Sequence, residues 1–138
     1  MARAWPDESL GVGDLHLSFP AVPQSVSAVR AALGSCARDC GFSQAAVQAV
    51  QLAGSEAASN VVLHAYRPPR EPATIDVTAA YRDHALTITV SDAGTGLRPD
   101  PDSPGLGFGL LVISKLADAV KFARSPAGGM SVQMRFNA

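Results

Sequence analysis

The chain has 138 residues, of which 47% are hydrophobic and 17% charged, and its formal net charge at pH 7 is −1. This balance is typical of one soluble globular domain that buries a sizeable core. Its lysines and arginines are mostly scattered singly, so the sequence lacks the basic patch that direct binding to nucleic acid or anionic lipid requires. We therefore expect no direct nucleic-acid binding and no membrane binding.

The first 14 residues are polar, contain glycine and lack the apolar segment of a secretory signal. We interpret residues 1–14 as a flexible lead-in and residues 15–138 as a single domain. The longest apolar run, FGLLVI over 108–113, is far too short to span a bilayer, and we expect a cytoplasmic protein. Cys36 and Cys40 have no second cysteine pair and no histidine at ligand spacing, which favours two reduced packing residues over a redox pair or half a metal site.

In chain order, the first expected strand is LHLSF over 15–19, in which apolar and polar residues alternate. An apolar stripe at helical spacing then predicts a helix over 25–40 that ends at Gly41. Ser43 is suited to cap a second, long helix, which stops before Pro68.

Two segments with period-two alternation, 74–81 and 85–90, predict a hairpin with its turn near Arg82 and Asp83. The segment after this hairpin is dense in Gly, Pro and Asp, which predicts a long loop. Loops longer than about 12–15 residues in compact domains are usually functional or disordered.

A third helix is predicted over 108–119, followed by a last hairpin of strands over 120–124 and 130–136. The resulting order is β-α-α-β-β-loop-α-β-β. Hairpin-joined strands and three helices predict an α/β two-layer sandwich, with a mixed, mostly antiparallel sheet and the helices on one face.

Three polar residues stand at four-residue intervals in the second helix: Glu56, Asn60 and His64, within SEAASNVVLHAY. Steps of four return side chains to nearly the same face of an α-helix, so one face packs and the other is directed at something polar. Two glycine-containing segments could join this face: DAGTG over 92–96 after a strand, and GLGFG over 105–109 before the third helix. Each segment alone is more often a plain turn or helix start.

Taken together, these segments resemble the GHKL ATPases, the fold shared by gyrase, heat-shock chaperone ATPases, mismatch-repair ATPases and histidine kinases. The closer resemblance is to the anti-sigma-factor serine kinases, the RsbW-type branch, and covers about residues 15–136. The box E-x-x-x-N-x-x-x-H-A/G-Y is matched by Glu56, Asn60, His64, Ala65 and Tyr66.

The remaining boxes are matched further along the chain. Asp92, Gly94 and Gly96 match the D-x-G-x-G box. Gly105 and Gly107 match the second glycine box, with Gly109 a looser fit. In the last hairpin, GGMSV resembles the G-T-x-V stretch of the family, with Gly129 and Ser131 as the nearest equivalents.

The resemblance implies a site for ATP with Mg²⁺, and the residue types suit this chemistry. The Asp92 carboxylate can accept a hydrogen bond from the adenine amino group, whereas a guanine carbonyl would leave it unpaired. Gly94 and Gly96 let the backbone approach the nucleotide without a Cβ. The glycines at 105, 107 and 109 lead into a helix N-terminus, which favours phosphate.

Three further roles are implied in the same site. Asn60 supplies a neutral oxygen for Mg²⁺. Glu56, one turn earlier, is positioned to act as general base on an incoming hydroxyl. Ser131 keeps the hydroxyl of the family threonine in the nucleotide site, and His64 is expected to be a structural hydrogen-bonder at the helix end.

The leading hypothesis is an anti-sigma regulatory factor with serine/threonine-protein kinase activity. The resemblance implies that it sequesters a sigma factor, phosphorylates an anti-anti-sigma antagonist of the STAS type, and forms a homodimer. The alternative is an ATP-binding regulator that controls a partner by binding only. Glu56 favours the kinase, whereas the loop over 97–104, shorter than is common in the family, favours the binding module. Arg98, the only cation of this loop, could reach a phosphate or be a solvated loop residue. A detached histidine-kinase catalytic domain is disfavoured by His64, where those proteins more commonly have an aromatic residue.

Overall fold

A five-stranded sheet forms one layer of the molecule. The computed structural model describes residues 14–95, 106–126 and 128–138. The strands are β1 (Leu15–Pro20), β2 (Thr74–Arg82), β3 (Ala85–Ser91), β4 (Ala119–Arg124) and β5 (Met130–Asn137). Their order in the sheet is β1-β2-β3-β5-β4, so β5 lies between β3 and β4. Every neighbouring pair is antiparallel, so the described sheet is antiparallel throughout rather than mixed.

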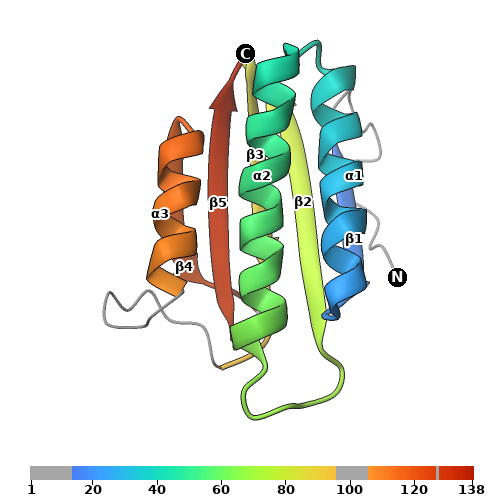
Figure 1. Ribbon diagram of the computed structural model, residues 1–138, viewed down its shortest axis with the longest axis vertical. Helices are drawn as coiled ribbons and strands as arrows, with labels where there is room; N and C mark the ends of the chain where they lie inside the picture. Colours follow the sequence, from blue (N-terminus) through green and yellow to red (C-terminus); the bar gives the residue numbers. More distant parts are fainter. Residues whose placement is uncertain (1–13, 96–105, 127) are drawn as a thin grey trace.

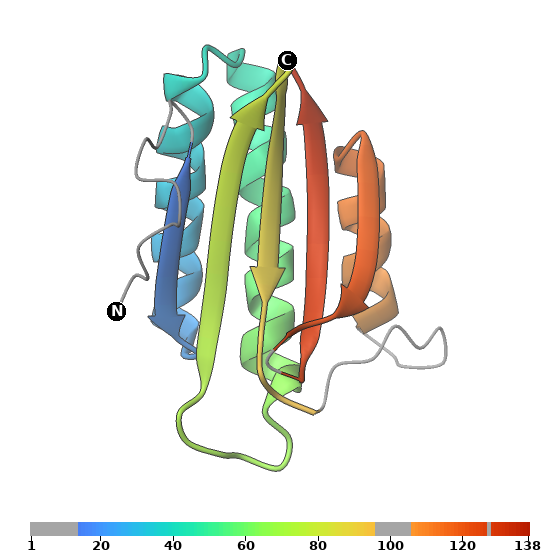
Figure 2. The same ribbon diagram turned by 180° about the vertical axis from the view of Figure 1, so that it is seen from behind.

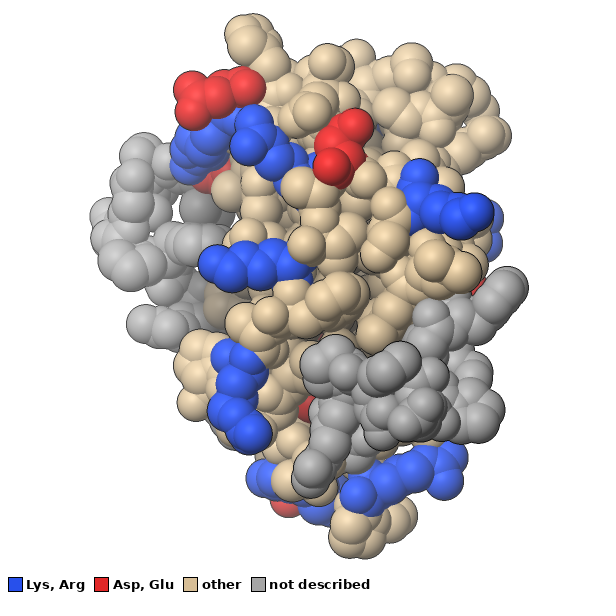
Figure 3. All heavy atoms as spheres, turned by 90° about the vertical axis from the view of Figure 1, so that its left-hand side faces the viewer, with Lys and Arg blue, Asp and Glu red and all other residues tan. Residues whose placement is uncertain are grey.

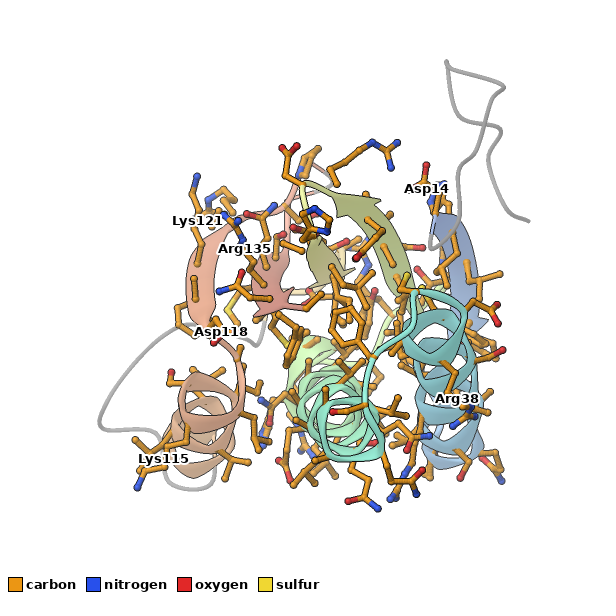
Figure 4. All side chains as sticks on the ribbon, turned by 90° about the horizontal axis from the view of Figure 1, so that it is seen from above. Asp14, Arg38, Lys115, Asp118, Lys121 and Arg135 are labelled. Carbon is orange, nitrogen blue, oxygen red and sulfur yellow. The ribbon has the colours of Figure 1, made fainter. Side chains whose placement is uncertain are left out.

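The helices form the second layer. They are α1 (Pro23–Asp39), α2 (Gln44–Asn60) and α3 (Leu106–Leu116), and a five-residue π-helix, η1 (Val61–Ala65), continues directly from α2. All three α-helices cover the same face of the sheet (Figure 1), and the opposite face carries none of them (Figure 2). The view along the strands shows the two layers in cross-section, with Lys121 and Arg135 on the helix-free side (Figure 4). The predicted two-layer α/β architecture is confirmed.

The hydrophobic core lies between these two layers. Alternate residues of β2, β3 and β5 are buried and apolar, which is the pattern of strands covered on one face. The helices meet them with small and branched side chains from α1 and α2. The largest fully buried apolar side chains are Leu33, Ile75, Leu86, Ile88, Ile113 and Met134.

Three boundaries differ from those expected, each for a local reason. The third helix begins earlier and ends at Leu116, because Ala119 pairs with Arg135 and starts β4 instead of ending the helix. The hairpin turn is at Asp83 and His84, which both have positive φ, while Arg82 still pairs with Ala85. The first helix begins at Pro23, where proline is well tolerated.

The helix caps and cysteines follow the sequence. Ser43 caps α2 by accepting a hydrogen bond from the Ala46 amide at 3.2 Å, and Gly41 has the positive φ that ends α1. Within the described residues, neither Cys36, which is buried, nor Cys40, which is partly buried, is in a disulfide bond. Burial, followed by the neighbouring Cys40, raises the pKa of the Cys36 thiol to about 12, so this thiol stays protonated at neutral pH.

The surface agrees with the low charge content of the sequence. Lysine and arginine side chains are spread over the side that carries α3 and β4, without one continuous basic block (Figure 3). No helix among the described residues is long and apolar enough to cross a membrane.

Candidate functional site

Three elements bring the expected site residues to one end of the molecule. The C-terminal ends of α2 and β3 and the first turn of α3 all lie at the lower end in Figure 1. From α2 come Glu56 and Asn60, one turn apart, and Asp92 comes directly after β3. The fold therefore joins the residues that the sequence placed in separate motifs.

Helix α3 lies against the polar side of α2 at Gly109. A methyl group on Gly109 would lie 3.1 Å from Glu56 Oε2 and 3.3 Å from both terminal atoms of the Asn60 amide. A side chain here would therefore crowd both polar groups. Gly109 matched its motif only loosely, yet it is the residue of α3 that lies against Glu56 and Asn60.

The Asn60 side chain is buried without its full set of hydrogen bonds. The residue is 6% exposed, and its Nδ2 has no hydrogen-bond partner among the described residues. Buried polar atoms in folded proteins are almost always paired, so an orphaned amide nitrogen points to a partner that binds from outside the chain. An amide can present a donor to a phosphate or, after rotation, an acceptor to a cation.

Asp92 has one occupied and one unoccupied carboxylate oxygen. The residue is 1% exposed, and its Oδ1 accepts hydrogen bonds from the amides of Gly94 at 2.9 Å and Met130 at 3.4 Å. Its Oδ2 is buried and has no hydrogen-bond partner in the part of the chain that the structure describes. Burial raises the pKa of this carboxyl above its usual range, although the two amide bonds oppose the rise. Asp92 thus has a fixed orientation and a spare acceptor.

Two glycines allow the close packing around Asp92. A methyl group on Gly94 would overlap the backbone carbonyl of Ala65 at the end of η1. A methyl group on Gly129 would overlap both the backbone and the side chain of Asp92. These glycines are needed here because other segments of the chain already occupy the space of a Cβ.

The end of η1 holds the segment after Asp92 in place. The Ala65 carbonyl accepts a hydrogen bond from the Thr95 amide at 2.9 Å. The Tyr66 hydroxyl accepts one from the Ala93 amide at 3.1 Å, and the Arg70 guanidinium donates one to the Ala93 carbonyl at 2.9 Å. Neither Tyr66 nor Arg70 has a role that the sequence alone predicts. The match of Tyr66 to the motif was the only signal for either.

The π-helix changes the register of the polar face. Its hydrogen bonds join residues five apart, so Ala65 rather than His64 follows Asn60 on the buried side. The side chain of His64 is partly exposed and makes no hydrogen bond to a described residue. Glu56 and Asn60 therefore share the contact with Gly109, whereas the hydrogen-bonding role expected of His64 has no support among the described residues.

Ser131 does not join the site. It pairs with Ser91 in the sheet, and both side chains point to the helix-free face, whereas Met130 and Val132 point towards the helices. The residue opposite Asp92 is Met130, 5% exposed, whose carbonyl accepts the Asp92 amide at 3.0 Å. The sequence carried this signal, because its apolar residues at 130, 132, 134 and 136 alternate with polar ones.

The remaining expected site residues fall in part outside the described residues. Gly96, Gly105 and the loop over 97–104 with Arg98 are among those not described. Gly107 lies in the first turn of α3.

Comparisons with known proteins agree on one family. Residues 19–136 match the histidine kinase-like ATPase domain. The chain is 32% identical over 122 residues to the serine-protein kinase RsbW of Listeria monocytogenes, covering 78% of this chain and 77% of that protein. It is 26% identical over 134 residues to the anti-sigma F factor of Clostridium acetobutylicum, covering 88% and 91% of the two chains.

A solved structure has the same fold. The RsbU and RsbW domains of a Mycobacterium tuberculosis protein match with a TM-score of 0.70 and 23% identity, over 90% of this chain. This chain corresponds to only 31% of that larger one. The family match spans most of the sequence, and the fold agrees with it. The chain therefore belongs to the histidine kinase-like ATPase domain family.

Proposed function

We propose that the site binds ATP with Mg²⁺ and that the protein is an anti-sigma regulatory factor with serine/threonine-protein kinase activity. One observation supports the ATP site. Two buried polar atoms, Asp92 Oδ2 and Asn60 Nδ2, have no hydrogen-bond partner within the described ranges, and both lie at the end of the fold where α2, β3 and α3 meet. Their chemistry suits the two ends of a nucleotide.

Asp92 is the base-reading residue of this proposal. Its Oδ1 is held by two backbone amides, which leaves Oδ2 to accept the adenine amino group. A guanine carbonyl facing the same oxygen would place two acceptors together, and both would lose a hydrogen bond. The site should therefore prefer ATP to GTP.

Asn60 and Glu56 act at the phosphate end. Bound Mg²⁺ would neutralise phosphate charge, and the Asn60 amide oxygen is a ligand of the type that this ion takes. The Glu56 carboxylate lies one helical turn earlier on the same side, where it can accept the proton of an attacking serine hydroxyl. The first turn of α3, with Gly107 and Gly109, offers backbone amides to the phosphates, and Gly96 and Gly105 belong to the same motifs.

The partners follow from the relatives. Proteins named anti-sigma F factor and serine-protein kinase RsbW are similar to this chain over most of its length. We therefore propose a sigma factor as the sequestered partner and a serine of an STAS-type anti-anti-sigma protein as the phosphate acceptor. A regulator that binds ATP and its partner without phosphorylating it is the second candidate, favoured by the shortness of the 97–104 loop.

Transfer of radiolabelled phosphate from ATP to the antagonist separates these two functions. Glu56→Gln should keep ATP binding but lower the transfer rate about 10²–10⁴-fold, because it cannot take a proton. Asn60→Ala should instead weaken Mg–ATP binding itself. The control is Asp39→Asn, which makes a comparable change at the exposed end of α1 and should leave both unchanged. A wild type that binds ATP and the antagonist but transfers no phosphate leaves only the binding function.

The proposed kinase is a homodimer. Its low charge content is compatible with association of two copies. Light scattering should report twice the monomer mass at micromolar concentration. A monomer mass that persists at high concentration contradicts this part of the proposal.

A further inference from the structure

The Tyr66 hydroxyl joins three parts of the chain. It donates a hydrogen bond to the Thr74 carbonyl at 2.7 Å and accepts bonds from the amides of Thr74 and Ala93, each at 3.1 Å. Thr74 is the first residue of β2, and Ala93 directly follows Asp92. One phenolic oxygen therefore links the end of η1 to both.

Each backbone amide from Asp92 to Thr95, directly after β3, donates a hydrogen bond. The Asp92 amide donates to the Met130 carbonyl, the Gly94 amide to the Asp92 side chain, and the Thr95 amide to the Ala65 carbonyl. The Ala93 amide donates to Tyr66. Of these four bonds, only the one to Tyr66 uses a side chain from outside the segment. A single substitution can therefore remove it without altering the segment itself.

The hydrogen bond from the Ala93 amide to Tyr66 also restricts the conformation of Asp92. The peptide unit between Asp92 and Ala93 is planar, so fixing the Ala93 amide restricts the ψ angle of Asp92. Oδ1 is already held by the Gly94 and Met130 amides. The direction of the spare Oδ2 therefore depends on the backbone that Tyr66 fixes.

We propose that Tyr66 is a positioning residue for base recognition: its hydroxyl holds the Asp92–Ala93 peptide so that Asp92 Oδ2 faces the base. This inference rests on the proposed ATP site. Tyr66 touches neither nucleotide nor phosphate in this account and acts only through Asp92. Removing its hydroxyl should therefore affect recognition of the adenine amino group and leave the phosphate end unaffected.

The test compares ATP with purine riboside triphosphate, which lacks only the 6-amino group, by calorimetry. The wild type should prefer ATP about tenfold or more, the value of one hydrogen bond to a charged group. In Tyr66→Phe this preference should fall at least about threefold, while the affinity for the analogue stays nearly unchanged. A general structural defect would weaken both ligands equally and leave their ratio as it was.

The matched control is Tyr81→Phe. It removes the same hydroxyl from the same type of residue near the other end of β2, seven residues from Thr74, where the ring packs edge-on against Phe42. Its preference for ATP should equal that of the wild type. A loss of preference in Tyr81→Phe as large as that in Tyr66→Phe would overturn the inference.

Failure of the inference and failure of the proposed function give different results. A wild type that binds both triphosphates equally contradicts base reading by Asp92, and the positioning role falls with it. A wild type that prefers ATP, together with a Tyr66→Phe variant that keeps the full preference, overturns the positioning role alone.

A second measurement needs no variant. In the nucleotide-free wild type, amide hydrogen exchange should be slow at Ala93, because its amide donates to the Tyr66 hydroxyl. An Ala93 amide that exchanges as fast as one in an unstructured peptide would overturn the inference even if Tyr66→Phe does not fold.

Discussion

Burial of Asp92 costs free energy in the absence of a ligand. A carboxylate that is 1% exposed and has one unpartnered oxygen has lost much of its hydration, and burial raises its pKa for this reason. Such a group is retained where function requires it, at the expense of stability. The residue that we propose to read the base is therefore also one where the stability of the ligand-free protein can be improved.

Asp92→Asn separates these two effects. The variant keeps the size of the side chain and the acceptor for the Gly94 and Met130 amides, but it removes the buried charge and places a donor where an acceptor is needed. ATP affinity should fall at least about tenfold, while the ligand-free protein should become more stable by about 1 kcal/mol. Calorimetry and urea unfolding measure the two quantities. A variant that is much less stable than the wild type would contradict the account.

The stability gain should depend on pH. Because the pKa of Asp92 is raised in the folded protein, the folded state holds its proton more tightly than the unfolded state does. Above the raised folded-state pKa, Asp92 is charged in both states, and the wild type bears the full free-energy cost of burying that charge. As the pH falls below this pKa towards that of the unfolded state, Asp92 becomes protonated in the folded protein and the cost decreases. The advantage of Asp92→Asn should therefore be largest at neutral pH and smaller in mild acid. Urea unfolding at several pH values checks this, and an advantage that grows in acid would be the contrary result.

Among the elements, α3 contacts α2 through Gly109, beside the polar side chains of the proposed ATP site. Ala is normally preferred to Gly in a helix by about 0.5–1 kcal/mol. At Gly109, however, the added methyl would lie 3.1 Å from Glu56 Oε2 and 3.3 Å from the Asn60 amide. These atoms are ends of side chains, which can move, so the crowding should affect the site more than the fold.

Gly109→Ala should therefore leave the stability nearly unchanged, because helix propensity offsets the crowding, but weaken Mg–ATP binding by about tenfold. Gly94→Ala provides the contrast, since its methyl would overlap the Ala65 backbone and should destabilise the protein by about 1–3 kcal/mol. Thermal unfolding and calorimetry on both variants distinguish the two cases. Equal loss of stability in the two variants would show that α3 does not pack against α2 in this way.

The helices and strands differ in how well the sequence predicts them. The order of helices and strands was predictable because period-two and helical patterns are strong in this chain. The π-helix over Val61–Ala65 was not, since its apolar residues fit an α-helix equally well, and in it Ala65 rather than His64 is buried. The placement of Ser131 was predictable from strand parity, but motif matching placed it on the wrong face.

At the scale of the whole molecule, the site depends on contacts between distant parts of the sequence. The Asp92 segment is held by Ala65 and Tyr66 from one side and by Met130 from the other. The insertion of β5 between β3 and β4 brings Met130 beside Asp92. Strand order is a non-local property that no local pattern reveals, which explains why sequence analysis identified Asp92 but not the residues that position it.

Calorimetric titration of the wild type with ATP and GTP, with and without Mg²⁺, is the decisive test of the proposed ATP site. Mg–ATP should bind at least about tenfold more tightly than Mg–GTP, because at purine position 6 adenine donates a hydrogen bond to Asp92 Oδ2, whereas guanine presents a carbonyl. Removing Mg²⁺ should weaken ATP binding. Equal affinity for ATP and GTP would contradict the assignment of Asp92, and binding of neither nucleotide would contradict the ATP site as a whole.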